Sequence, residues 1–402
     1  MSRDDRVIIA GAGPVGLVTA LGLAQSGVPV TLVESEPALT RDLRAGSFHP
    51  PTLELMEPLG ITPKLLEIAI KVPVWQMRDR TEGLVAEFDL SLLKNDTPYP
   101  FRAHCEQYKL TPIALDLLKQ QPGAEVFFST EFLGFEQTKD HVDVRVRGPE
   151  GERVLRGSFL VGGDGGRSAV RKAIGVEFEG FTWPERFLVI STYHDLGQYG
   201  FAPNAYIADP DEWAAVFKMP GEEGRGLWRL AVPTPADLDD EAVLAEDYAQ
   251  KTLRGLLQSE KLFPIAYRSA YKVHQRVAKD FHHGRVVLAG DAAHINNPLG
   301  GFGLNSGIHD ACNLYPKLAR VWHGDAPMEE LDLYGRQRRT ATVDFVQAMS
   351  IRNKRTLEER DPQIRRQRRE ELKAIAADPR QAYEYLLNTS MINSIRKANA
   401  TI

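Results

Sequence analysis

Glycines and one acidic residue near the start of this sequence have the types and spacing needed to bind a dinucleotide. Residues 11–16 read G-A-G-P-V-G and match G-x-G-x-x-G, and Glu34 lies 18 residues after Gly16. In such a loop Gly11 permits a tight turn, Gly13 lets the backbone approach a pyrophosphate, and Gly16 allows close helix–strand packing. Glu34 can accept hydrogen bonds from ribose hydroxyls, and its charge would repel a 2′-phosphate. The pattern predicts a dinucleotide site that disfavours NADP; an ordinary glycine-rich turn is the alternative.

Two later segments each place an aspartate among small residues after an apolar run. Asp164 lies in G-G-D-G-G and Asp291 in A-G-D-A-A. Asp164 could bind a ribose hydroxyl or brace its own loop, whereas Asp291 is placed to accept hydrogen bonds from polyol hydroxyls. Downstream of Asp291, Gly300, Gly301 and Gly303 remove side chains where a flat ligand could approach the backbone.

These residues need strands and helices to position them. Residues 6–10 and 28–33 are β-branched apolar runs typical of buried parallel strands, and residues 17–25 between them are compatible with a helix. The start of that helix would offer free N–H groups to phosphates. A second helix is predicted to begin near Leu304, with its N-terminus stabilising negative charge on the ligand. Pro316 should kink or end that helix.

Length and composition exclude several classes of protein. The chain has 402 residues, a net charge of −5 and 43% hydrophobic residues, which is typical of a globular protein without a general attraction for nucleic acid or membranes. Cys105 and Cys312 match no metal or redox spacing, so no metal site is expected and a reducing, cytoplasmic setting fits. Residues 7–33 carry no charge, but their glycines and prolines argue against a membrane span.

The three glycine-rich segments, in this order and at these distances, resemble the single-component FAD-dependent aromatic hydroxylases, the para-hydroxybenzoate hydroxylase-like flavoprotein monooxygenases. The resemblance covers roughly residues 6–350. It implies an α/β fold, with a Rossmann-like FAD-binding domain, an inserted antiparallel-sheet substrate domain and a C-terminal helical segment. It also implies that NADH or NADPH reduces FAD, that O₂ adds at flavin C4a, and that this hydroperoxide hydroxylates a small phenolic or heteroaromatic compound.

The resemblance assigns FAD contacts to the three segments and to two stretches between them. The contact residues it implies are Gly11, Gly13, Pro14, Val15, Gly16, Glu34, Arg44, Ala45, Gln107, Asp164, Asp291, Gly301, Gly303, Leu304 and Asn305. Arg44 and Ala45 belong to the segment with the loop where the flavin can swing. Asp291 corresponds to the ribitol-binding aspartate, and the backbone of Leu304 and Asn305 faces the flavin N1/O2 edge.

A phenolic substrate reacts better as the phenolate, so a base or a hydrogen-bonding relay is expected. His194 and Tyr206 on the predicted insertion, and His49 after the flavin-loop segment, are the candidates, and the sequence does not choose among them. By the resemblance, Pro298 lies against the flavin ring near the hydroxylation site. His294 is expected to brace the turn that carries Asp291.

Four strand-like runs within residues 181–271 predict an antiparallel sheet that walls a substrate pocket; a purely structural lobe is the alternative. The expected divisions are 1–74, 101–180 and 272–330 for the FAD-binding domain, 75–100 and 181–271 for the substrate domain, and 331–402 for the helical segment. Because only about 90 residues follow the last signature, a further thioredoxin-like domain is not expected.

Other functions on the same scaffold remain open. A halogenase or reductase is one alternative, although the five tryptophans form no Trp-x-Trp-x-Ile segment. A non-enzymatic FAD-binding sensor is another. The expected partners are a small aromatic substrate, O₂ and NAD(P)H, without nucleic acid or membrane, and a homodimer is allowed for.

Overall fold

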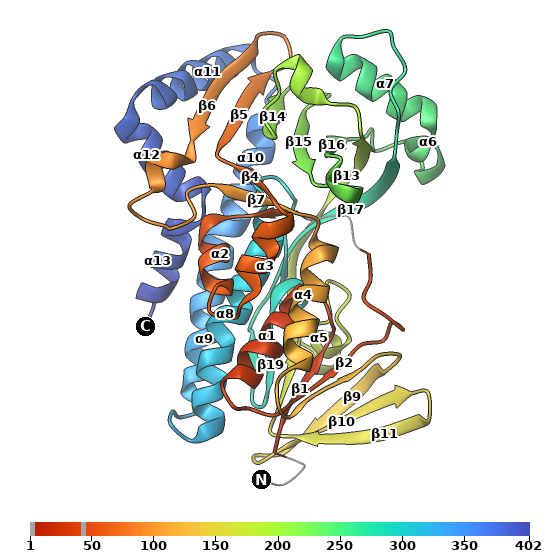
Figure 1. Cartoon of the computed structure of the whole chain (residues 1–402), viewed down its shortest axis with the longest axis vertical. Coiled ribbons are helices and arrows are strands. Elements are labelled where there is room, and N and C mark those ends of the chain that lie inside the picture. Colours follow the sequence, from red (N-terminus) through yellow and green to blue (C-terminus); the bar gives the residue numbers. More distant parts are fainter. Residues whose placement is uncertain (1–4, 42–45) are drawn as a thin grey trace.

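A six-stranded, mainly parallel sheet forms the lower half of the molecule in Figure 1. The computed structural model describes residues 5–41 and 46–402. In spatial order the strands of this first sheet are β18 (His282–His283), β19 (Val286–Leu288), β12 (Phe159–Gly162), β1 (Val7–Ala10), β2 (Val30–Val33) and β8 (Ala124–Phe127). Every residue of β1, β2, β12 and β19 is buried, which explains why these runs are uniformly apolar rather than alternating.

Long helices cover this sheet. α1 (Pro14–Gln25) connects β1 to β2 and packs against α4 (Gln107–Lys119) and α8 (Phe302–His323). α1 and α8 approach closely, because a Cβ added at Gly22 would lie 2.5 Å from the ring of Tyr315. α9 (Glu329–Ala341) runs beside α8, as Figure 1 shows.

Pro316 does not end α8, so of the two predicted effects, a kink or an end, the second is wrong. The helix continues past it to His323 and terminates at Gly324, which is in the left-handed conformation with φ +82°. The three glycines near its start and the glycine after its end define the helix more strongly than the internal proline, because the buried stripe that packs on α1 extends on both sides of Pro316.

A second, eight-stranded sheet lies above the first in Figure 1. Its strands in spatial order are β20 (His294–Ile295), β17 (Tyr267–Ala278), β13 (Phe178–Thr192), β16 (Leu227–Pro233), β15 (Ala214–Met219), β14 (Asn204–Ala208), β5 (Val74–Asp79) and β6 (Gly83–Asp89). Neighbouring strands are antiparallel except β14 and β5, which are parallel.

The two faces of this second sheet bury different side chains. Leu188 and Ile190 pack on one face, which α6 (Asp240–Leu244) and α7 (Glu246–Leu257) cover. We call this the α7 face. Phe187 and Val189, one residue out of phase, pack on the other face, which α11 (Pro362–Ala377) and α12 (Pro379–Thr389) cover. We call this the α12 face.

Smaller elements complete the chain. One three-stranded sheet comprises β9 (Glu131–Gln137), β10 (Val142–Gly148) and β11 (Gly151–Gly157), and another comprises β3 (Ser47–Phe48), β4 (Ile70–Val72) and β7 (Arg102–His104). The further helices are α2 (Pro50–Met56), α3 (Ile61–Ile68), α5 (Ala169–Ile174), α10 (Ala348–Leu357) and α13 (Ile392–Ala400).

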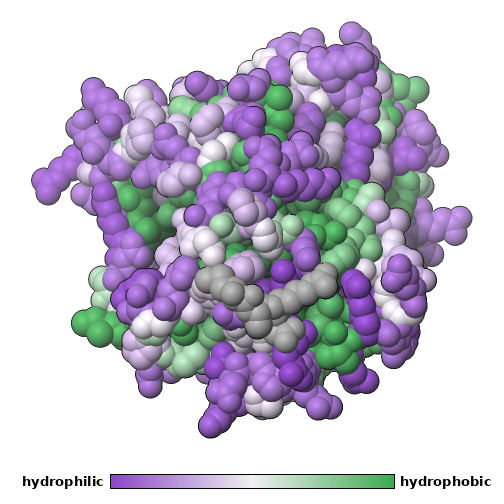
Figure 2. All heavy atoms as spheres, turned by 60° about the horizontal axis from the view of Figure 1, so that its bottom comes forward, coloured by the Kyte–Doolittle hydropathy of each residue, from purple (hydrophilic) through white to green (hydrophobic). Residues whose placement is uncertain are grey.

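Hydrophilic side chains cover much of the face in Figure 2, with hydrophobic areas between them. None of the helices in the described residues is both long and apolar enough to cross a membrane.

Candidate active site

In the first glycine loop, Gly11 and Gly16 are tightly packed, whereas Gly13 has free space beside it that a ligand could occupy. A Cβ at Gly16 would lie 1.9 Å from the carbonyl oxygen of Gly11, and a Cβ at Gly11 would lie 2.6 Å from that of Gly163. Around Gly13, by contrast, no atom of the described residues comes within 4 Å of an added Cβ. Pro14 begins α1 directly afterwards. The open side of the loop at Gly13 is therefore where a pyrophosphate can meet the helix N-terminus.

Glu34 lies at the end of β2 and already holds this loop. Its carboxylate accepts hydrogen bonds from the N–H of Ala12, at 2.7 Å, and from the N–H of Glu36, at 2.9 Å. A carboxylate has about four acceptor positions, so ribose hydroxyls can still bind to it. The acid thus links the glycine loop to the predicted ribose site.

In the second segment the structure shows a bracing role for Asp164. Its carboxylate accepts hydrogen bonds from the Ser168 hydroxyl, at 2.5 Å, and from the N–H of Val170, at 3.0 Å. Arg171, which no sequence motif singled out, donates to the carbonyls of Gly166 and Ala292, both at 2.8 Å. The second segment is therefore fastened to the turn that follows Asp291.

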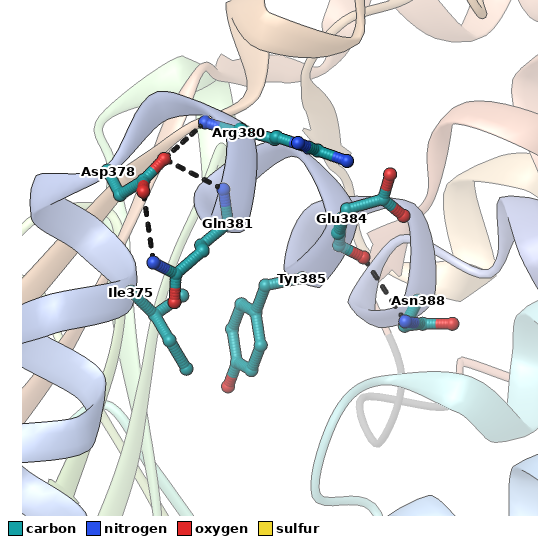
Figure 3. Close-up of a pocket in the computed structure, with 7 residues that line it drawn as sticks. All are labelled: Ile375, Asp378, Arg380, Gln381, Glu384, Tyr385 and Asn388. Atoms are coloured by element: carbon teal, nitrogen blue, oxygen red, sulfur yellow. Dashed lines mark hydrogen bonds between the residues drawn. The ribbon is translucent and has the colours of Figure 1, made fainter.

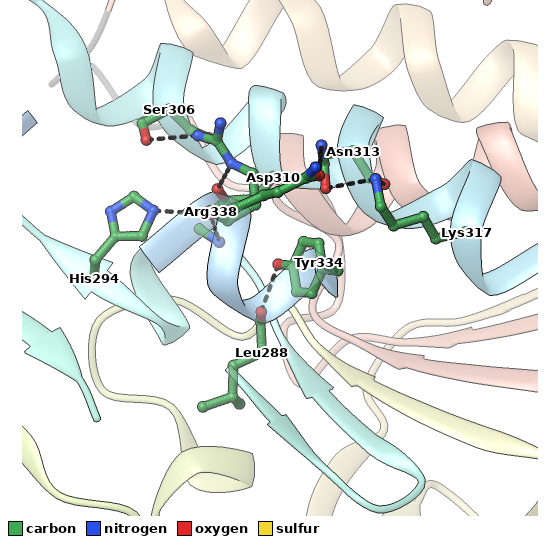
Figure 4. Close-up of polar contacts among 10 residues, drawn as sticks. Leu288, His294, Ser306, Asp310, Asn313, Lys317, Tyr334 and Arg338 are labelled. Atoms are coloured by element: carbon green, nitrogen blue, oxygen red, sulfur yellow. Dashed lines mark hydrogen bonds and ion pairs between the residues drawn. The ribbon is translucent and has the colours of Figure 1, made fainter. Parts of the chain in front are cut away.

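A buried ionic cluster holds the third segment, as Figure 4 shows. Asp310 on α8 accepts hydrogen bonds from the N–H of Gly290 (2.9 Å), from His294 Nε2 (2.8 Å) and from Arg338 Nε (2.6 Å). Burial would raise the pKa of Asp310, but His294 and Arg338 outweigh it and lower that pKa to about 2. His294 braces the turn through Asp310, and the side chain of Asp291 is left exposed at its edge.

The start of α8 carries the remaining predicted contacts. Gly300 and Gly301 have φ +109° and +70°, a region that favours glycine, and α8 begins one residue before Gly303. The side chain of Asn305 donates to the carbonyls of Ser47, at 2.7 Å, and Gly301, at 2.5 Å. The sequence assigned only a backbone role to Asn305, whereas its side chain joins β3 to the helix start.

Four further predicted residues are placed as follows. Val15 lies between the first and third segments, because a Cβ at Gly290 would come 2.6 Å from its side chain. Gln107 is the first residue of α4 and is half-buried, and Leu304 packs on the core around the first sheet. Pro298 is half-buried, and its carbonyl accepts a hydrogen bond from the N–H of Gly301. Arg44 and Ala45 lie outside the described residues.

Next to this helix start, buried polar side chains face one another without completing their hydrogen bonds. Arg102 on β7 is 2% exposed, and Tyr206 on β14 is 6% exposed. Atoms with no hydrogen-bond partner among the described residues are Arg102 Nε and Nη1, the Tyr206 hydroxyl, His49 Nδ1, His104 Nε2 and Trp75 Nε1. Buried polar atoms are normally paired, so these atoms mark where a polar ligand would bind. We call this set of five residues the unpaired cluster.

The histidines of the unpaired cluster are neutral. Burial holds the pKa of His49 well below its ordinary value, and the Arg102 charge lowers it further. Burial likewise lowers the pKa of His104 to about 3. His49 Nε2 lies 2.9 Å from the carbonyl oxygen of Gly300, which can only accept, so the proton is on Nε2 and Nδ1 is an acceptor. Arg102 is thus the permanent cation of this cluster.

The structure separates His194 from the other two candidate bases. Its Nε2 lies 3.1 Å from the Tyr199 hydroxyl, and its ring packs 4.9 Å from that of Phe263. Both neighbours belong to the α7 face, whereas Tyr206 belongs to the α12 face. The second sheet therefore lies between His194 and Tyr206, so these two of the three alternative candidates cannot serve the same site.

Helix α12 closes the unpaired cluster from the outside. Arg102 Nη2 donates to the carbonyl of Thr389 at 3.3 Å, and the Tyr385 ring stacks on Phe88 with centroids 4.7 Å apart. Tyr385 also lines an open surface depression along α12, which Figure 3 shows. The C-terminal helical segment therefore contributes to the site, which the sequence did not indicate.

Comparison with known proteins identifies the family. The FAD binding domain family matches residues 4–349. This chain is a member of that family. It is 32% identical to para-nitrophenol 4-monooxygenase of Pseudomonas sp. (strain WBC-3), over 98% of each chain. It is 31% identical to 6-hydroxy-3-succinoylpyridine 3-monooxygenase HspB of Pseudomonas putida (strain DSM 28022 / S16), over 90% of this chain and 91% of the other.

Solved structures agree. The crystal structure of p-nitrophenol 4-monooxygenase PnpA from Pseudomonas putida DLL-E4 matches with a TM-score of 0.91 and 31% identity over 98% of each chain. These findings confirm the predicted α/β fold with a Rossmann-like FAD domain and a substrate domain, and they confirm an FAD-dependent aromatic hydroxylase. The open loop at Gly13 and the exposed Asp291 fit bound FAD.

Proposed function

We propose that this chain uses NADH or NADPH and O₂ to hydroxylate a small phenolic or hydroxylated heteroaromatic ring in the unpaired cluster. The observation that carries the proposal is the set of unpartnered buried atoms beside the start of α8. Two relatives are named for para-nitrophenol and for 6-hydroxy-3-succinoylpyridine, which are single rings with a hydroxyl and a second polar group. Such a ring needs both an apolar wall and a few polar partners.

Bound FAD supplies the oxygenating chemistry, and the residues of the chain orient the ring and exclude water. Trp75 and Phe88, with ring centroids 4.7 Å apart, and Tyr206, edge-on to Trp75 at 6.0 Å, provide aromatic walls. His49 Nδ1 can accept a hydrogen bond, and the Tyr206 hydroxyl can donate one. Helix α8 begins directly after Gly301, and the free N–H groups of its first turn would stabilise negative charge on a flavin bound there.

We also infer that Asp291 binds the ribitol of FAD. The exposed Asp291 follows Gly290, whose N–H is held by the buried carboxylate of Asp310. The turn therefore needs little reorganisation when FAD binds. An Asp291→Ala variant should purify with much less FAD, and full flavin occupancy would contradict the assignment. A charge-assisted hydrogen bond of this kind is worth roughly 1.5–3 kcal/mol.

The reaction is tested with FAD-loaded protein. NADH or NADPH oxidation, O₂ uptake and ring products are measured with 4-nitrophenol, hydroxypyridines and hydroxybenzoates, and incorporation of label from ¹⁸O₂ identifies hydroxylation. We expect at least one ring to be hydroxylated. If every compound leaves oxidation unstimulated and the ring unchanged, the proposed function is wrong.

Two further proposals concern setting and assembly. Both cysteines are reduced and buried, which favours a cytoplasmic location. Light scattering after size-exclusion chromatography tests the homodimer that the sequence analysis allowed for.

A further inference from the structure

We propose that Arg102 selects the substrate as an anion and binds the phenolate oxygen of the ring, with the Tyr206 hydroxyl as a second donor. The inference rests on the proposed function, because it names the ionic form of the same substrate.

The charge of Arg102 has no internal partner. Within the described part of the chain, no carboxylate forms an ion pair with its guanidinium. Its neighbours include the Thr389 carbonyl, the Trp75 ring, 5.8 Å from Cζ, and the Tyr206 hydroxyl, all of them uncharged. A buried cation without a counter-charge is costly, and proteins normally pair it. A ligand that brings a negative oxygen would provide the missing partner.

The direction of the unpaired donors supports a ligand rather than a structural role. Nη2 is held by Thr389, which fixes the plane of the guanidinium and leaves Nε and Nη1 unpartnered. The Tyr206 hydroxyl lies close enough to the guanidinium for the two groups to interact, but they are not aligned in a well-formed hydrogen bond, so both can turn to a ligand. Three donors on two side chains are therefore available to one oxygen atom.

Neither histidine of the cluster is suited to remove the phenol proton. Burial and the Arg102 charge keep the pKa of His49 well below its ordinary value, and the pKa of His104 is about 3. Burial raises the pKa of Tyr206 and brings that of Tyr385 to about 12, so both phenols stay protonated. A site without an effective base must favour the ionised form directly, and the phenol proton then leaves to solvent when the phenolate binds.

The test uses 4-nitrophenol bound to oxidised, FAD-loaded protein, because its phenolate absorbs visible light and no turnover is needed. We expect the bound compound to titrate at least one pH unit below the free compound. In Arg102→Met the bound compound should titrate at or above the free value, and its dissociation constant at a pH where it is ionised should rise roughly tenfold or more. Arg102→Lys, which keeps the charge but loses the planar fork, should lie between them.

Two controls isolate the charge. 4-Nitroanisole, which cannot ionise, should bind equally to the wild type and Arg102→Met. Arg78→Met removes another arginine of this region, which lies over Phe201 and donates to the Gly200 carbonyl, and it should leave the titration unchanged. Flavin content confirms that each variant is folded.

Three results would overturn the inference: 4-nitrophenol fails to bind, Arg102→Met binds its phenolate as tightly as the wild type, or 4-nitrobenzoate depends on Arg102 more strongly than 4-nitrophenol does. The last would assign the arginine to a ring carboxylate. Phenolate binding through Arg102 without hydroxylation of any ring would refute only the proposed function, and hydroxylation that is indifferent to Arg102 would refute only this inference.

Discussion

Two regions of the molecule, the predicted cofactor half around Asp310 and the proposed substrate half around Arg102, treat buried charge in opposite ways. In the cofactor half Asp310 is fully buried and satisfied by Gly290, His294 and Arg338. In the substrate half Arg102 is almost as buried, yet two of its nitrogens have no partner among the described residues. Hydrogen bonds and ion pairs within the protein hold a turn in place. A group without such partners can instead form its hydrogen bonds with a ligand, which then gains binding free energy.

This difference follows the tasks of the two halves. A bound cofactor is best held by a rigid cradle, and the groups around Asp310 are joined to each other, whereas the predicted FAD contacts Gly13 and Asp291 lie on the accessible side. A substrate must enter and leave, so we propose that its polar partners, the unpaired cluster, stay unpartnered within an apolar wall until it binds.

The largest expected loss in the free energy of unfolding comes from removing the charge of Asp310, whose hydrogen bonds are all made within the protein. Asp310→Asn removes the charge that pairs with Arg338 and His294, and loss of one partner from a buried pair typically costs about 3–5 kcal/mol. Urea denaturation at neutral pH measures the free energy of unfolding. Asp211→Asn, which breaks an exposed pair with Arg360, is the control and should cost less than about 0.5 kcal/mol. Equal effects of the two variants would contradict the comparison.

The same aspartate gives a pH dependence. Its pKa is lowered from 3.8 to about 2 on folding, so its stabilising contribution is complete above about pH 4 and is lost as pH falls towards 2. The difference in unfolding free energy between wild type and Asp310→Asn should therefore shrink through this window. A difference that is constant from pH 5 to pH 2 would count against the ionic role.

The next prediction compares two alanine substitutions in the first glycine loop, one expected to weaken FAD binding and the other to lower thermal stability. Gly13 has φ −71° and ψ 177°, which alanine adopts readily, and an added Cβ meets no described atom. Gly13→Ala should leave the melting temperature of the FAD-free protein unchanged but raise the FAD dissociation constant tenfold or more, since the methyl group occupies the pyrophosphate position. Gly16→Ala, whose Cβ would collide with the Gly11 carbonyl, should destabilise even the FAD-free protein. Fluorescence titration with FAD and thermal melting distinguish the two variants. An unchanged FAD affinity in Gly13→Ala would show that the pyrophosphate does not bind beside Gly13.

A smaller change in the free energy of unfolding, a gain rather than a loss, is expected when Arg102 of the unpaired cluster is replaced. Arg102→Met replaces an unpaired buried cation with an apolar side chain of similar length beside Trp75. Such replacements are often neutral or stabilising, so the free energy of unfolding should rise by about 1 kcal/mol although ligand binding is weakened. Denaturation of ligand-free protein provides the measurement. A loss of 3 kcal/mol or more would show that Arg102 is structural and that the two halves do not differ.

The sequence indicated the geometry of the first glycine loop but not that of the unpaired cluster, for a physical reason. The roles of Gly11, Gly16 and Glu34 depend on a strand, a turn and a helix that are consecutive, so their spacing carries the information. Arg102 meets Thr389 across 287 positions, and no local pattern records that contact. Asp310 and Arg338 were missed similarly, because their pairing depends on how α8 and α9 pack.

Strand alternation offered a signal that the sequence analysis did not use. Tyr206 alternates with Ala205 and Ile207, which pack on the α7 face, so its side chain had to lie on the α12 face. His194 follows the end of β13 and contacts the residues of the α7 face.

The smallest expected effect is therefore at His194. His194→Gln keeps a polar side chain near Tyr199 on the α7 face, so stability should change by less than about 0.5 kcal/mol. Turnover and KM for any ring that the protein hydroxylates should change less than twofold. Tyr206→Phe, which removes one of the three unpartnered donors on Arg102 and Tyr206, is the matched comparison and should weaken binding of the ionised ring while that of 4-nitroanisole is unchanged. A tenfold loss of turnover in His194→Gln, with FAD content intact, would place the chemistry on the α7 face and refute the assignment of the unpaired cluster to the substrate.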